Sequence, residues 1–154
     1  MKFLNNSKEL KNNPLLTLLM LFLVGTLMLF LISDLLLHHY QIGLILNQAQ
    51  ETIMGNEENF TEPMLFDTLL EHLHIDILTS MITLMLLAVI LIRLEPKAKQ
   101  YTIHLAFLSA IFSQIAFILS FYFYVAIPLW IGFFLLWHFV AFYMAIKSIW
   151  RLYK

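Results

Sequence analysis

The sequence predicts an all-α membrane protein in which four transmembrane helices form an up-down bundle. Of the 154 residues, 61% are hydrophobic and 12% are charged, and the mean hydropathy is +0.83. A soluble domain is about half apolar and a quarter charged. Four apolar stretches are each long enough to supply the roughly 20 helical residues that cross a bilayer. We therefore expect one membrane domain over residues 1–154, with no separate soluble domain.

Composition also excludes several classes of protein. The chain has no Cys, which excludes disulfides, thiolate metal sites and Cys nucleophiles. Nine basic residues are balanced by ten acids, for a formal net charge of −1, so no basic face for nucleic acid is expected. The sequence has no phosphate-binding glycine loop, Ser/His/Asp arrangement or zincin helix. An enzyme of a soluble type is therefore not expected.

The first span is predicted at residues 14–37, which are nearly all Leu, Phe, Met and Val as far as Ser33 and Asp34. This apolar run is longer than the roughly 7–15 residues of a secretory signal, and no small-residue cleavage motif follows it. We therefore expect a helix that is retained in the membrane.

The loop over residues 40–66 keeps helical character. Apolar residues recur at helical spacing across residues 40–54, and Gly55 is placed to end that helix. We expect the first helix to continue outward through this segment and the second to begin at the N-cap residue Thr61, so that both project as a pair. The alternative is that Gly43 kinks the helix and the segment lies on the membrane surface.

The remaining spans are predicted at residues 73–92, 101–124 and 129–149. Residues 93–99 form the turn between the second and third spans. Residues 125–128 alone separate the third span from the fourth. Because so short a connection joins antiparallel neighbours, these two spans are expected to form a tight hairpin.

The basic residues predict the orientation of the bundle. They precede the first span, separate the second from the third and follow the fourth, whereas eight of the ten acids lie at or beyond the opposite end. Loops rich in Lys and Arg are cytoplasmic. Both termini are therefore expected in the cytoplasm, in a plasma membrane (the inner membrane if the source is bacterial). The basic residues are Lys2, Lys8, Lys11, Arg93, Lys97, Lys99, Lys147, Arg151 and Lys154.

Ionisable side chains gather where the first two helices meet on the outer side. Asp34 and His38 are four residues apart, and Glu71 and His74 are three apart, so each pair shares a helix face. Since the two helices are antiparallel neighbours, the four side chains are predicted to form a site for zinc, iron or manganese. The alternative ligands at this end are His39, His72 and Asp76. The alternative without a metal is a set of interfacial ion pairs that keeps the helices in register.

The spacing of Glu71 and His74 resembles half of the ligand motif of di-iron carboxylate bundles. Those bundles need a second Glu-x-x-His and further Glu residues, and this chain has no second such pair. The resemblance therefore covers four residues and implies only a metal site in a bundle core.

His138 and Gln114 lie near the middle of the fourth and third spans. Because these spans form a hairpin, we expect the two side chains to lie at similar depth and to share a hydrogen bond away from water. Alternatively, His138 ligates the iron of a haem b that neighbouring aromatic side chains enclose. A second imidazole at the same depth is not evident in the sequence.

Three functions are compatible with these features. The first is a small accessory or assembly subunit of a larger membrane complex, with an outer His/carboxylate cluster able to bind a metal. The second is a haem- or metal-binding membrane protein in electron transfer or cofactor delivery. The third is a proton or ion conductor, although the second span has no acid deeper than Asp76. The expected partners are the lipid bilayer and either other membrane subunits or a second copy of the chain.

Overall fold

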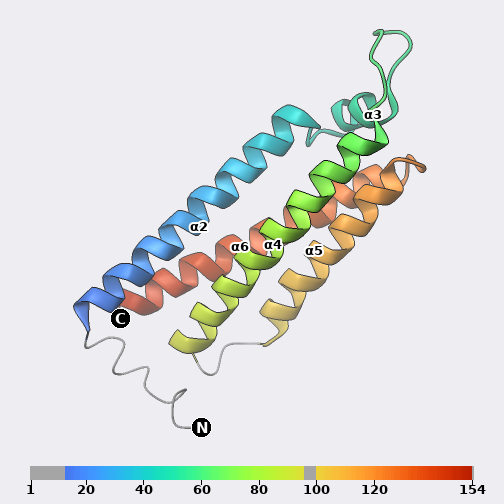
Figure 1. Ribbon diagram of the computed structural model, residues 1–154. Helices are drawn as coiled ribbons and strands as arrows, with labels where there is room; N and C mark the ends of the chain where they lie inside the picture. The colour runs from blue at the N-terminus through green and yellow to red at the C-terminus, as the bar shows by residue number, and fades with distance from the viewer. Residues whose placement is uncertain (1–12, 96–99, 154) are drawn as a thin grey trace.

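The computed structural model describes residues 13–95 and 100–153, which form five α-helices and no β-strand. Four of these helices are long and apolar enough to cross a membrane, and successive ones run antiparallel (Figure 1). The predicted polytopic, four-helix membrane fold is thereby confirmed. The helices are α2 (Pro14–Gln41), α3 (Leu46–Met54), α4 (Phe66–Leu94), α5 (Gln100–Ser120) and α6 (Ala126–Tyr153).

Helix α2 begins where the sequence supplies an N-cap. The Asn13 side chain accepts hydrogen bonds from the backbone N–H groups of Leu15 and Leu16. Pro14 occupies the start of the helix, where the missing proline N–H leaves no hydrogen bond unmade. These contacts fix the first turn of α2.

Helix α2 ends at Gln41 and does not continue to Met54 as predicted. The N–H groups of Ile42 and Gly43 both donate to the carbonyl of His38. Gly43 has a φ of +94°, a left-handed conformation that favours glycine because it has no Cβ. The chain therefore turns here, and the alternative expectation of a break at Gly43 is confirmed.

Helix α3 lies across one end of the bundle and contacts α6 (Figure 1). Its residues Ala49 and Ile53 are buried, so apolar packing holds it against the bundle. Gly55 ends the helix with a φ of +79°, as the sequence predicted. The end of the bundle marked by this helix is called the α3 end.

The predicted N-cap at Thr61 is wrong, because α4 begins at Phe66 with no side-chain cap. Thr61 pairs with Asn56 in an antiparallel backbone bridge. Nearby, the N–H of Met64 donates to the carbonyl of Thr52 on α3. These bonds hold the loop before α4 in a non-helical conformation.

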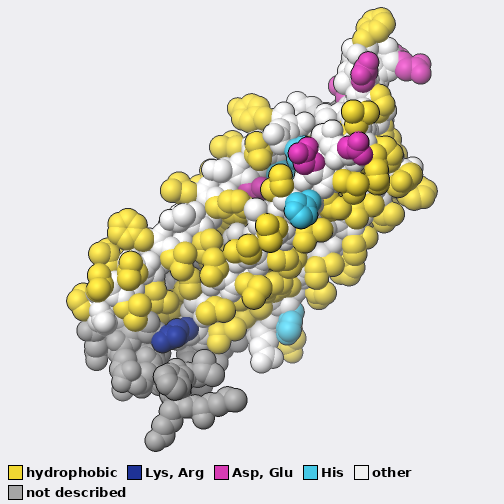
Figure 2. Space-filling model, viewed as in Figure 1, with side chains coloured by type: hydrophobic (Ala, Val, Ile, Leu, Met, Phe, Trp, Pro, Cys, Tyr) yellow, Lys and Arg dark blue, Asp and Glu magenta, His cyan; other side chains and the backbone are white. Residues whose placement is uncertain are grey.

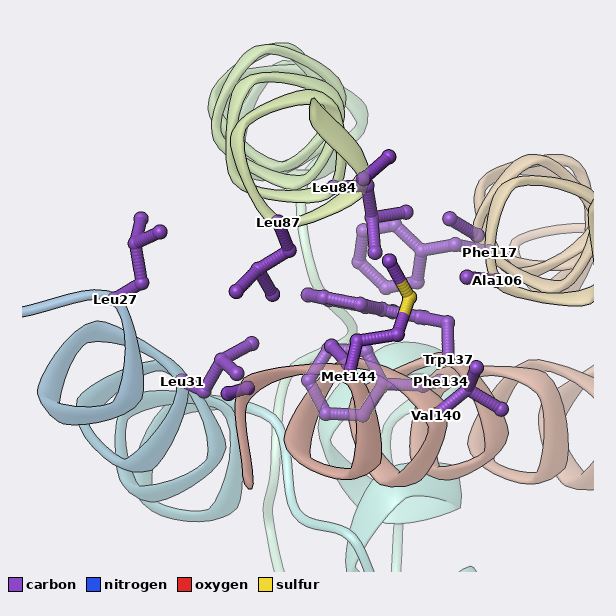
Figure 3. Packing of buried hydrophobic residues seen from close by; sticks show 14 of the residues in the cluster. Leu27, Leu31, Leu84, Leu87, Ala106, Phe117, Phe134, Trp137, Val140 and Met144 are labelled. Atoms are coloured by element: carbon purple, nitrogen blue, oxygen red, sulfur yellow. The ribbon is translucent and has the colours of Figure 1, made fainter. Parts of the chain in front are cut away.

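The core is built around α6, which packs against each of the other four helices of the described chain. Aromatic and aliphatic side chains from α2, α4, α5 and α6 meet at the centre (Figure 3). Helix α2 is the most peripheral span: 22% of its most apolar stretch is buried, against 39–44% in the other spans. Small residues allow α5 and α6 to approach closely. The fully buried alanines are Ala106, Ala110, Ala141 and Ala145, and the fully buried serines are Ser113, Ser120 and Ser148.

The two ends of the bundle carry opposite charge. The start of α2 and the end of α6 lie at one end, called the terminal end, and α3 lies at the other (Figure 1). Acidic side chains gather near the α3 end, and basic ones appear towards the terminal end (Figure 2). Lys2, Lys8, Lys11, Lys97, Lys99 and Lys154, with residues 96–99 of the predicted turn, lie outside the described residues.

Glu95 joins α4 to α6 at the terminal end. Its Oε2 lies 2.9 Å from Lys147 Nζ, and Arg151 Nη2 donates to its Oε1 at 2.9 Å. The hydrogen bonds from Lys147 and Arg151 lower the pKa of Glu95 from its ordinary value. This acid therefore offsets part of the positive charge at the terminal end.

Candidate metal centre

Four ionisable side chains from three helices meet inside the bundle. His38 Nε2 on α2 lies 3.0 Å from Asp76 Oδ2 on α4, and His138 Nε2 on α6 lies 3.0 Å from Asp34 Oδ2 on α2. Along α2, Asp34 Oδ1 and His38 Nδ1 are 3.5 Å apart. The contacts therefore run in the order His138, Asp34, His38, Asp76. This group is called the His/Asp cluster.

Helical periodicity places each member of the cluster on an inward face. Asp34 and His38 are one turn apart on α2, in line with buried leucines of the same helix. Asp76 belongs to the buried face of α4 and His138 to that of α6. On each helix a position three or four residues before the cluster is buried too, namely Leu31, Leu73 and Phe134, as expected for a face that packs against neighbours.

Both histidines are held in the orientation that presents Nε2 to the cluster. His38 Nδ1 lies 3.0 Å from the carbonyl of Asp34, and His138 Nδ1 lies 2.9 Å from the carbonyl of Phe134. A carbonyl can only accept a hydrogen bond, so each Nδ1 is the donor. Histidines that ligate metals are commonly fixed in this way. His138 Nε2 is buried and has no well-aligned hydrogen bond among the described residues.

The cluster is almost sealed from solvent. The exposed fraction of the side chain is 3% for His38, 2% for His138, 9% for Asp76 and 11% for Asp34. Charge buried at such depth is costly unless it is paired. Two carboxylates beside two imidazoles form a site that is balanced by positive charge, carried either by ring protons or by a divalent cation.

The spacing of the ligand atoms suits one metal ion. One atom each from Asp34, His38 and Asp76 lie within 4.8 Å of one another, so small side-chain shifts can bring them to the bond lengths of about 2.0–2.2 Å that zinc requires. His138 adds a second imidazole beside Asp34. A mixed nitrogen and oxygen set of this kind favours zinc, iron or manganese over soft copper(I).

A cleft between α2 and α4 leads to the cluster. Its volume is about 280 Å³. Six further residues with Asp34 and Asp76 line it, and the polar ones nearest the α3 end are Gln41, Glu71 and His72. His72 is half-buried, and its ring centroid lies 6.5 Å from that of His38.

The structure divides the residues that the sequence singled out. Asp34 and His38 lie in the cluster, with Asp76 from the alternative ligands. Glu71 and His72 line the cleft. His74 and His39 are exposed, because each is turned away from the buried face of its helix.

The structure places His138 against Asp34 rather than against Gln114. Gln114 is buried on α5 and makes no hydrogen bond to His138 in the described part of the chain. The His138 ring packs against those of Phe134 and Trp137, with centroids 4.4 and 3.7 Å away. A haem iron at His138 would therefore require these side chains to move.

Sequence reasoning did not foresee that His138 joins Asp34. The sequence did contain a signal for this contact. An ionisable group inside a membrane needs a partner, and only histidines are available near Asp34 to supply a positive charge. Depth counted from the expected helix ends was too coarse to choose between Gln114 and Asp34 as the partner.

Comparison with known proteins agrees with the fold. Residues 43–154 match the family model Aq_1264_TM, a transmembrane helical domain. This region includes Asp76 and His138, whereas Asp34 and His38 on α2 precede it. No curated protein and no solved structure matches the chain. The chain belongs to the Aq_1264_TM family of transmembrane helical domains.

Proposed function

We propose that this protein is a metal-binding subunit of a larger membrane complex and that its His/Asp cluster binds one divalent transition-metal ion. The observation that carries the proposal is the convergence of three ligand atoms within 4.8 Å of one another. Asp34 and His38 supply two of them from α2, and Asp76 supplies the third from α4. A fourth ligand group, His138, lies beside Asp34. Zinc, iron(II) and manganese(II) are the ions that suit these ligands.

The charge of the cluster is compatible with one divalent metal ion. Two ionised carboxylates carry two negative charges, which one divalent cation neutralises while both imidazoles stay neutral and bind through Nε2. The Nδ1 contacts with backbone carbonyls leave Nε2 as the ring nitrogen that faces the cluster at His38 and His138. Without a metal ion, an extra proton on each imidazole supplies the same two positive charges, with Nε2 donating to the carboxylates at 3.0 Å.

The exposed surface of α2 supports the role as a subunit. This span is less buried than the other three, and large apolar side chains such as Leu18, Phe22 and Leu29 are exposed along it. Helices of other membrane proteins can pack on such a surface as lipids do. Purification in mild detergent should then recover stoichiometric partners, whereas an isolated chain would count against this part of the proposal.

The metal is tested by direct analysis of protein purified in mild detergent. Wild-type protein should bind one zinc, iron or manganese ion per chain. Asp76→Asn and His38→Gln should each weaken binding by at least about tenfold, since metal sites lose that much even when an outer partner of a ligand is removed. The matched controls are Asp67→Asn and His104→Gln, which change exposed residues of α4 and α5.

Four outcomes would contradict the proposed site. Wild-type protein could bind no metal, or the controls could lose it as readily as the cluster variants. Loss of metal in His74→Gln but not in Asp76→Asn would instead support the ligand set predicted from the sequence. An absorption band typical of haem that disappears in His138→Gln would replace the metal ion with a haem.

A further inference from the structure

The cleft of about 280 Å³ that reaches the cluster is lined by further polar side chains outside the cluster. Glu71 and His72 lie about one helical turn nearer the α3 end than Asp76, and on α2 Gln41 lies about one turn nearer that end than His38. Polar side chains therefore occur at two levels. The outer level, formed by Gln41, Glu71 and His72, is in contact with solvent. The inner level is the His/Asp cluster, which is almost sealed from solvent.

We infer that this cleft is the route by which a divalent metal ion reaches the cluster and that Glu71 and His72 capture the hydrated ion on the way. The inference rests on the metal-binding function proposed above. It makes the bound metal exchangeable with the solution at the α3 end. The metal is then a cargo or a replaceable cofactor rather than a permanently enclosed structural ion.

The size of the cleft fits a hydrated ion. A water molecule occupies about 30 Å³ in the liquid, so an ion with six waters needs about 180 Å³. The volume of about 280 Å³ exceeds this. The cleft therefore has room for the ion with its water shell, so that waters can be exchanged for side-chain ligands in steps.

Aromatic packing closes the cluster on the side of α6. The ring of Phe134 lies 4.5 Å from His38 and 4.4 Å from His138, centroid to centroid, and that of Trp137 lies 3.7 Å from His138. The ring centroid of Trp130 lies 6.0 Å from that of Phe134 and 6.4 Å from that of His38. Access from that side would require these buried rings to separate, whereas the cleft between α2 and α4 is already present.

The chemistry of the outer pair suits temporary capture. Glu71 is exposed and His72 is half-buried, so both keep contact with water, and together they offer one carboxylate oxygen and one imidazole nitrogen. Two ligands hold a divalent ion less tightly than the set of three or four in the cluster. The ion should therefore pass from the outer pair to the inner cluster.

The rates of metal exchange test the inference. Zn²⁺ is mixed with metal-free protein in detergent, loading is followed in time, and release to excess EDTA is followed separately. The double variant Glu71→Gln/His72→Gln should slow both loading and release by about tenfold or more, in the range by which charged clefts accelerate association. Its equilibrium affinity should stay within about twofold, because the cluster itself is intact. The control is Asp67→Asn/His104→Gln.

A second variant blocks the route without changing its charge. Ile75 lines the cleft, and Ile77 on the same helix does not; both are exposed, by 52% and 45%. Ile75→Trp should slow exchange, and Ile77→Trp should leave it unchanged.

Unchanged rates in both test variants would overturn the inference. A fall in affinity without a change in loading rate would also overturn it, because Glu71 and His72 would then be permanent ligands. Failure of wild-type protein to bind Zn²⁺, iron or manganese would refute the proposed function instead.

Discussion

At the scale of residues, orientation around a helix axis separates the histidines that reach the His/Asp cluster from those that do not. His38 is buried in the cluster, whereas the next residue, His39, is exposed. Consecutive residues differ by about 100° around the axis, so one of such a pair faces neighbouring helices and the other faces outward. Asp76 and His74 on α4 differ for the same reason.

Glu95 provides a test of pH dependence at a single residue. Hydrogen bonds from Lys147 and Arg151 lower its pKa. A carboxylate whose pKa is lowered in the folded state stabilises that state above its ordinary pKa, and the stabilisation is lost as the pH falls through the lowered value. Glu95→Gln should therefore lower the free energy of unfolding by about 0.2–1 kcal/mol at neutral pH, the range for ion pairs that solvent screens.

Thermal unfolding of wild-type and Glu95→Gln protein in detergent, measured from pH 7 down to pH 3, checks this expectation. The difference in unfolding temperature should be present at pH 7 and should shrink as the pH falls below the ordinary carboxyl range. A difference that stays constant with pH would mean that Glu95 stabilises the protein through packing rather than charge.

At the scale of elements, one turn sets the positions of α2 and α3. The break at Gly43 directs the chain into α3, which covers the end of the bundle. Without it, a continued α2 would carry Ala49 and Ile53 away from the core. The same turn ends α2 one turn beyond His38, whose carbonyl accepts from Ile42 and Gly43. The geometry of the turn is therefore linked to that of the cluster.

Gly43→Ala tests this link. A Cβ at Gly43 would meet Gln48 Cβ at 2.7 Å, and the φ of +94° is unfavourable for alanine. We expect a loss of at least about 1–2 kcal/mol of stability, the cost of a left-handed conformation in a residue with a Cβ. The same variant should also bind metal more weakly.

Gly25→Ala is the matched control for that experiment. Gly25 lies within α2, and a Cβ there meets nothing within 4 Å. Alanine is the better helix former by about 0.5–1 kcal/mol, so this variant should be neutral or slightly stabilised in thermal unfolding. Equal destabilisation by both substitutions would show that the turn at Gly43 has no special requirement for glycine.

At the scale of the whole molecule, an apolar shaft separates an acidic end from a basic end (Figure 2). The exposed leucine, isoleucine and phenylalanine side chains of the shaft contact the lipid bilayer, and the charged ends lie at its two surfaces. The polar lining residues of the cleft nearest the α3 end are Gln41, Glu71 and His72, and the negative charge at that end attracts cations. The shape and the charge of the molecule thus agree with metal uptake from that side.

The orientation follows from the same charge separation. Because the described residues Arg93, Lys147 and Arg151 lie toward the terminal end, we predict that this end faces the cytoplasm. The chain has no Cys, so single cysteines can report it. Glu57→Cys, in the loop after α3, should react with a membrane-impermeant maleimide on intact cells, and Tyr153→Cys should react only after permeabilisation. The reverse pattern would overturn the predicted orientation.

Local properties of the sequence determined much of this protein. Hydropathy identified four spans, and helical spacing identified the pair Asp34 and His38. Gly55 was correctly expected to end α3. These features depend on residues close together in the chain, so a single helix is enough to reveal them. The N-cap at Thr61 was predicted wrongly because the backbone bridge between Thr61 and Asn56 competes with helix formation there.

Tertiary structure alone decided which ionisable groups meet. The sequence left Glu71, His72, His74 and Asp76 as competing partners on one helix, and it did not connect His138 with Asp34. Those choices depend on how α2, α4 and α6 are rotated and shifted against one another. Rotation and shift arise from the packing of buried side chains on different helices, such as Leu31 of α2 and Phe134 of α6. The hydrophobic periodicity of a single helix does not determine how that helix packs against its neighbours.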